Sequence, residues 1–72
     1  MAWDNFSPFS SSNISSIRYE NEQFVLEVTF QNGGIYQYFD VPTHIVADFK
    51  QAVSKGEFLA REIKGRFRYS KV

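Results

Sequence analysis

The chain has 72 residues, a length typical of one domain, and a chain of this size buries only about 60% of its unfolded surface, so its core must be small. Aromatic residues make up 18% of the chain, and their large side chains bring the most buried area per residue to such a core. The net charge is zero, and the lack of cysteine excludes disulfides and thiolate metal sites. Neither a signal peptide nor a membrane-spanning run is present, which predicts a soluble cytoplasmic protein.

The zero net charge conceals an uneven distribution of charge along the chain. Residues 1–49 carry one basic and six acidic side chains, a net charge of −5, and residues 50–72 carry seven basic and two acidic ones, a net charge of +5. Because charges are screened beyond about 8 Å in physiological salt, a basic segment can attract a polyanion even in a neutral protein. The alternative is a solvated helix face followed by a basic tail, with no ligand.

The N-terminal segment shows no sustained periodicity and ends in a run of serines. This composition predicts an extended or disordered arm over residues 1–12, followed by a single domain over residues 13–72. Trp3, Phe6 and Phe9 give the arm three apolar side chains at a spacing of three. They can contact either the arm's own domain or a groove on a partner, and packing on its own domain is the favoured interpretation.

Two runs of alternating apolar and polar residues follow, at 14–20 and 24–31, and they predict two strands joined by a polar connection. A third run at 35–39 is β-branched and aromatic. It comes after Asn32-Gly33-Gly34, which supplies the positive φ angles of a tight turn. The three strands are therefore predicted to form an antiparallel meander over residues 14–40.

The length of the second turn decides the role of Tyr36 and Tyr38. With a two-residue turn at Asn32-Gly33, both tyrosines point away from the core as a stacking platform, and Gln37 is buried in their place. With a three-residue loop over 31–33, both tyrosines face the apolar side of the preceding strand and belong to the core. The second register is favoured, because burying the Gln37 amide without partners costs about 1 to 3 kcal/mol.

After the third strand the apolar spacing changes from that of a strand to that of a helix. The pattern predicts an amphipathic helix over 44–53 with Thr43 as its N-cap, and a capping box from Ser54 to Glu57 begins a second helix over 55–64. The predicted fold class is therefore α+β, a three-stranded antiparallel β-meander with two C-terminal helices packed on one face.

No constellation of catalytic or metal-ligating residues is present in the sequence. His44 is the only histidine, and there is no cysteine or second histidine to share a metal ion or a nucleophile's proton. Asn32-Gly33-Gly34 is not a phosphate-binding loop, because no Lys-Ser or Lys-Thr pair and helix follow it. We therefore expect no enzymatic activity, no bound metal and no cofactor.

Several short motifs occur in a characteristic order between residues 11 and 72. They are Ser11-Ser12-Asn13-Ile14, Tyr19, Leu26, Val28, Phe30, Asn32-Gly33, the pair Tyr36 and Tyr38, Val41-Pro42, Ala52-x-Ser54-x-Gly56, and Ile63-Lys64-Gly65 with an aromatic residue at Phe67. Together they resemble the KTSC family, named for its occurrence at the C-terminus of some lysyl-tRNA synthetases and found also as stand-alone bacterial proteins. The resemblance implies no established activity, and it suggests RNA binding through the attachment to tRNA synthetases.

Two non-enzymatic functions agree with these patterns. The first is binding of RNA or tRNA by a basic-aromatic segment, with Tyr36 and Tyr38 either as a stacking pair or as part of the core. The residues of this segment are Lys55, Arg61, Lys64, Arg66, Phe67, Arg68, Tyr69 and Lys71. The second is a protein-interaction module in which a sheet edge and the aromatic arm dock a protein partner or a second copy. The first is favoured because of the family's association with tRNA synthetases, and no membrane partner is expected.

Overall fold

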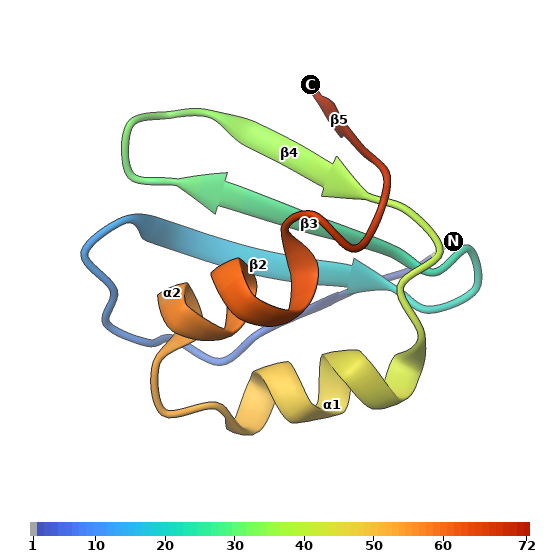
Figure 1. The fold of residues 1–72 in the computed structure, drawn as a ribbon, viewed down its shortest axis with the longest axis horizontal. Coiled ribbons are helices and arrows are strands. Elements are labelled where there is room, and N and C mark those ends of the chain that lie inside the picture. The colour runs from blue at the N-terminus through green and yellow to red at the C-terminus, as the bar shows by residue number, and fades with distance from the viewer. Residues whose placement is uncertain (1) are drawn as a thin grey trace.

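The structure, a computed structural model, describes residues 2–72. Five strands form one antiparallel sheet in the order β1-β2-β3-β4-β5, and the helical segments lie on one of its faces (Figure 1). Among the described residues, none of the helices has the length and apolar character that a membrane-spanning helix requires. The elements in chain order are β1 (Trp3–Asn5), β2 (Ile14–Glu20), β3 (Val25–Phe30), β4 (Ile35–Tyr38), α1 (Thr43–Gln51), α2 (Lys55–Phe58), the π-helical turn η1 (Leu59–Ile63) and β5 (Tyr69–Lys71).

The α+β class and the antiparallel sheet are confirmed, but the predicted number of three strands is wrong. β1 pairs with β2 at one edge of the meander, and β5 pairs with β4 at the other. Each outer strand is only three residues long and depends on pairing with a longer strand. The sequence pattern of such a short segment does not predict this pairing. β1 lies within the segment predicted as an arm, and the division into residues 1–12 and 13–72 stays a prediction.

The loop between β3 and β4 adopts the longer of the two registers considered. The backbone N–H of Phe30 donates to the carbonyl oxygen of Gly34 at 2.8 Å, and Gly33 has a φ of 94°, which glycine adopts without steric cost. As a result, Tyr36 and Tyr38 lie opposite buried residues of β3 and share their face of the sheet. Both tyrosines therefore face the helical layer.

The first helix begins one residue earlier and ends two residues earlier than the predicted range 44–53. Pro42 is the N-cap residue and no side chain caps the helix, so the prediction of Thr43 as N-cap is wrong. The proline ring already holds φ at −68°, which suits a chain entering a helix. At the other end, Ala52 leaves the helix with extended angles, φ −65° and ψ 136°.

The second helix starts as the capping box predicts, with the backbone N–H of Glu57 donating to Ser54 Oγ at 3.2 Å. α2 continues directly into η1, where the N–H of Lys64 donates to the Leu59 carbonyl oxygen at 2.8 Å, the i to i+5 bond of a π turn. The helical segment ends at Ile63, one residue before its predicted end.

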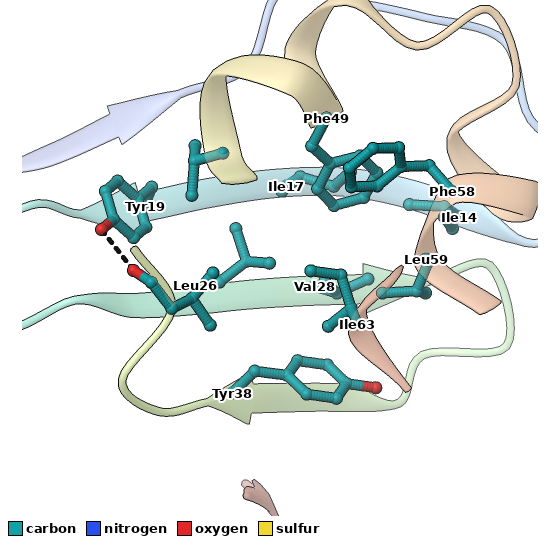
Figure 2. Close-up of a cluster of buried hydrophobic side chains, with 12 residues drawn as sticks. Ile14, Ile17, Tyr19, Leu26, Val28, Tyr38, Phe49, Phe58, Leu59 and Ile63 are labelled. Atoms are coloured by element: carbon teal, nitrogen blue, oxygen red, sulfur yellow. Dashed lines mark hydrogen bonds between the residues drawn. The ribbon is translucent and has the colours of Figure 1, made fainter. Parts of the chain in front are cut away.

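Phe49 of α1 is the centre of the aromatic core. Its ring stacks on that of Phe58 with centroids 4.8 Å apart, and the ring of Phe6 meets it edge-on at 5.3 Å. Figure 2 shows Phe49 and Phe58 side by side over the sheet. Phe6 and Phe9 both pack against this core, which confirms the interpretation that the aromatic residues of the N-terminal segment contact their own domain.

Tyr19 joins the sheet to the segment that leads into α1. Its hydroxyl donates to the Val41 carbonyl oxygen at 2.6 Å (Figure 2), and the N–H of Val41 donates to the Phe24 carbonyl oxygen at 3.0 Å. Phe24 and Asp40 both have a φ of 60°, a region that non-glycine residues seldom adopt, so these bonds hold two strained turns together. Tyr19 is buried, and this burial raises the pKa of its hydroxyl.

Replacing Tyr19 by Phe should lower the free energy of unfolding by about 1 to 3 kcal/mol, because the buried Val41 carbonyl loses its hydrogen-bond donor while the ring remains. Urea unfolding followed by the fluorescence of Trp3, the single tryptophan, measures this difference. A variant with the wild-type midpoint and slope would contradict the role assigned to the hydroxyl.

Candidate nucleic-acid interface

The basic and aromatic residues predicted as one binding segment lie in several separate places. Lys64, Tyr69 and Lys71 line a groove beside β4 and β5. Lys55 lies instead beside the N-terminal segment, with its ammonium group 5.5 Å from the centre of the Phe9 ring. The segment is therefore divided, and the groove collects only part of it.

The three arginines of the segment are all in ion pairs. Arg61 and Arg66 both contact the carboxylate of Glu62, at 3.2 and 2.8 Å, and Arg68 contacts that of Asp40 at 2.9 Å. The pair between Glu62 and Arg66 forms even though the helical segment ends between the two residues. Such exposed pairs add little to stability, but each carboxylate offsets part of the charge that an arginine offers to a polyanion.

An open groove of roughly 700 Å³ lies where the sheet extends beyond the helical layer. α1 lies on the β2 side of the sheet, whereas β4 and β5 lie at the opposite side (Figure 1). The outer strands provide one side of the groove, and the residues that follow η1 provide another. The lining residues are Phe30, Asn32, Gly34, Tyr36, Tyr38, Lys64, Gly65, Tyr69 and Lys71.

Four aromatic rings form a connected row in the groove. The ring centroids of Phe30 and Tyr36 are 5.5 Å apart, those of Tyr36 and Tyr69 are 5.7 Å apart, and those of Tyr69 and Tyr38 are 5.8 Å apart. These distances lie within the range of about 4.5–7 Å that aromatic pairs prefer. Tyr69 is 61% exposed, so its ring is available to a ligand, whereas the predicted stacking residue Phe67 is half-buried against the core.

Tyr38 belongs to both the core and the groove. It is only 3% exposed and lies opposite Leu26 on the face that carries the helices (Figure 2). Burial raises the pKa of the Tyr38 hydroxyl, and the neighbouring hydroxyls of Tyr36 and Tyr69 raise it further. The hydroxyl therefore stays protonated at neutral pH and can donate a hydrogen bond.

Two lysines and no carboxylate line the groove. The ammonium group of Lys64 lies 5.5 Å from the centre of the Phe30 ring, and Lys71 lies opposite Tyr36 in the pairing of β5 with β4. Within residues 2–72, neither lysine is in an ion pair. The groove therefore combines positive charge with the exposed ring of Tyr69, and its chemistry suits an anion that carries a flat, apolar group.

The sequence analysis did not place Phe30, Asn32, Gly34 or Gly65 in the site, although they line the groove. The Oδ1 atom of Asn32 accepts a hydrogen bond from the N–H of Gly34 at 3.0 Å and so fixes the turn that precedes β4. The turn and the helix end were both visible as local signals. Their proximity follows from the packing of η1 on the sheet, because the helical segment ends beside Phe30.

The opposite face of the sheet carries a polar network that pairs its own charges. Arg18 Nε donates to the carboxylate of Glu27 at 2.6 Å, and Gln37 Nε2 donates to it at 2.9 Å. Burial by itself would raise the pKa of Glu27, but these hydrogen bonds and the charge of Arg18 outweigh burial and hold the pKa below its usual value. The Arg18 guanidinium also lies 4.1 Å from the centre of the Trp3 ring. Among the residues that the structure describes, no three potential ligands are grouped so that they could hold a metal ion.

The chain forms a small α+β domain with an antiparallel sheet and an open groove, lined by aromatic side chains, beside β4 and β5. Residues 10–67 match the model of the KTSC domain family. The chain therefore belongs to the KTSC family, as its motifs indicated. The family model describes a small domain and indicates no catalytic family.

The relatives include both large enzymes and small proteins. A lysine–tRNA ligase of Trichormus variabilis is 36% identical over 61 residues, which are 85% of this chain and 11% of that enzyme, and one of a Nostoc species is 38% identical over the same share of each. The chain thus spans about a tenth of these enzymes. A protein of Tsukamurella paurometabola is 34% identical over 61 residues, 85% of this chain and 91% of that protein.

A crystal structure of a KTSC domain protein from Yersinia pestis has the same fold. It is 42% identical to this chain, the superposition covers 99% of both chains, and the TM-score is 0.90. The five-stranded arrangement described above is therefore shared with a solved member of the family.

The two tyrosines of β4 should differ in their effect on stability. Replacing Tyr38 by Ala should cost about 3 to 5 kcal/mol, because it opens a cavity in the core, and replacing the half-buried Tyr36 by Ala should cost about half as much. Urea unfolding of both variants measures the two values, with Tyr38→Phe as the control that keeps the ring. Equal costs for the two alanine variants would be inconsistent with the burial described here.

Stability should also fall in alkaline solution. The raised pKa values of Tyr19 and Tyr38 mean that the folded chain holds protons that the unfolded chain releases above about pH 10. Their contribution is therefore fully present below about pH 10 and is lost as the pH rises through the folded pKa values. Urea unfolding at stepped pH should show this decline, and the decline should be smaller in Tyr19→Phe. An unchanged decline in that variant would rule out the contribution of Tyr19.

Proposed function

We propose that the chain is a non-catalytic binding module that binds single-stranded RNA in the groove beside β4 and β5. The observation that supports this most directly is the convergence of Tyr36, Tyr38 and Tyr69 with Lys64 and Lys71 in one open groove whose lining contains no carboxylate. Aromatic rings stack on unpaired bases, and lysines neutralise phosphates. The two kinds of residue therefore suit the bases and the phosphate backbone of a single strand.

The family relation supports the same ligand class. The relatives include lysine–tRNA ligases of Trichormus variabilis and of a Nostoc species, and this chain corresponds to about a tenth of each enzyme. A domain attached to such an enzyme is well placed to contact RNA, and RNA or tRNA is therefore the partner that we propose. A cytoplasmic location is part of the same proposal, because these relatives act on tRNA.

The arrangement changes which cations we expect to carry the binding. Lys64 and Lys71 are unpaired and lie in the groove, whereas Arg66 and Arg68 contact carboxylates outside it. We therefore assign the phosphate contacts to the two lysines. The arginines and Lys55 contribute to RNA binding at most through the long-range electrostatic field of the protein surface.

The alternative function, a protein-interaction module, has less support from the geometry. Its docking arm is engaged already, since Phe6 and Phe9 pack against the core and β1 pairs with β2. A protein partner at a sheet edge is the interpretation to adopt if no RNA binds.

Binding of single-stranded RNA should be weak and moderately dependent on salt. Two phosphate contacts predict a slope of about −1.4 in a plot of log affinity against log salt concentration, from about 0.7 released counterions per contact. Fluorescence anisotropy with a labelled single strand and a labelled duplex, from about 20 to about 300 mM salt, measures the slope. The duplex should bind more weakly, because its bases are not free to stack on the tyrosines.

Two double variants separate the groove from the rest of the basic segment. Lys64→Gln with Lys71→Gln should weaken binding and bring the slope close to zero, whereas Arg66→Gln with Arg68→Gln removes the same charge outside the groove and should leave the slope nearly unchanged. Both pairs are on the surface, so melting temperatures should stay close to wild type. The proposal fails if neither RNA binds at the lowest salt, or if the arginine variant loses as much binding as the lysine variant.

A further inference from the structure

The groove has two chemically different ends. Lys64 lies over Phe30, and Lys71 is paired with Tyr36, so both ammonium groups come from positions next to the Phe30 and Tyr36 end of the ring row. Tyr69 and Tyr38 form the other end. A cationic end next to an aromatic end suits a ligand with one anionic group and one flat ring system.

The size of the groove indicates a short ligand. Its volume of roughly 700 Å³ falls in the range of about 300–1,000 Å³ that is usual for sites of single small molecules. Domains that follow a nucleic-acid strand instead occupy about 4 to 16 nucleotides along an extended charged surface. Here the arginines that could extend such a surface are held in ion pairs with Glu62 and Asp40.

We propose that the groove recognises a single nucleotide unit, so that a free nucleoside monophosphate binds in it. The base stacks on the exposed ring of Tyr69, and the phosphate lies at the end that carries Lys64 and Lys71. The inference rests on the proposed function and narrows its ligand from a strand to one nucleotide. A longer RNA then gains little affinity beyond that of its best-placed nucleotide.

The positions of the residues favour a preformed site. Tyr36, Tyr38, Tyr69 and Lys71 are on paired strands, and Lys64 directly follows η1 and donates its backbone N–H to Leu59. Tyr38 is fixed by the core, and its ring in turn contacts that of Tyr69. Because the three tyrosines and Lys71 are on paired strands, their backbone loses little conformational entropy when the ligand binds.

A titration of the isotope-labelled chain, followed by two-dimensional NMR of its backbone amides, tests the proposal. The ligands are adenosine monophosphate, adenosine, inorganic phosphate and a single-stranded oligoadenylate. We expect adenosine monophosphate to shift the amides of residues 30–38 and 64–71 in a saturable way. Adenosine and phosphate alone should each bind at least about ten-fold more weakly, because each engages only one end of the groove.

Substitutions assign the two ends separately. Tyr69→Leu should weaken binding of the monophosphate at least about five-fold, while Tyr69→Phe should retain it, because stacking needs the ring and not the hydroxyl. Lys64→Met with Lys71→Met should reduce the affinity for the monophosphate to that for adenosine. Arg61→Met is the matched control, since Arg61 is exposed and does not line the groove.

The outcomes distinguish this inference from the proposed function. If the oligoadenylate binds in the groove and the monophosphate does not, the single-nucleotide site is wrong and RNA binding stands. If neither binds, both proposals fail. If phosphate alone binds as tightly as the monophosphate, or if Tyr69→Leu binds like wild type, the groove is a simple anion site and recognition of the base is refuted.

Discussion

The contact of Phe49 with Phe58 and Phe6 determines where the helices lie on the sheet. The stacked pair joins α1 to α2, and the backbone N–H of Phe6 donates to the Ile17 carbonyl oxygen, which attaches the third ring to the β2 edge. The helical layer is therefore held at the N-terminal side of the sheet. Tyr38 of β4 still belongs to the core, so the groove begins beyond it, beside the exposed strand β5.

Tyr38 links the stability of the core to the shape of this groove. Its ring is buried beside Leu26, yet it also contacts Tyr69, whose ring is exposed. The buried ring of Tyr38 therefore supports one side of the exposed ring of Tyr69. The same arrangement means that substitutions at Tyr38 alter folding and binding together, whereas those at Tyr69 alter the surface alone.

Signals local in sequence predicted the local structure well. The alternation in residues 14–31, the glycine turn before β4 and the Ser54 capping box each depend on neighbouring residues, and the structure has the corresponding strands, turn and helix start. The pairing of β5 with β4 joins residues more than thirty positions apart, and each strand contributes few residues to it. For that reason the sequence analysis could not predict which of the candidate residues share one groove. It also could not distinguish them from the arginines that form ion pairs. The candidates that line the groove are Tyr36, Tyr38, Lys64, Tyr69 and Lys71.

The proposed anion site depends on the ion pairs around the groove, which leave Lys64 and Lys71 as its unpaired cations. Glu62 offsets one of the two charges of Arg61 and Arg66, and Asp40 offsets that of Arg68, so the three arginines together keep a net charge of about +1 outside the groove. Fields from exposed charges decay within about 8 Å in physiological salt, so the two unpaired lysines dominate the potential inside the groove. An anion without a ring system gains only this modest attraction. In the proposed site, selectivity comes from the tyrosines, whose stacking depends on the shape of the ligand and is insensitive to salt.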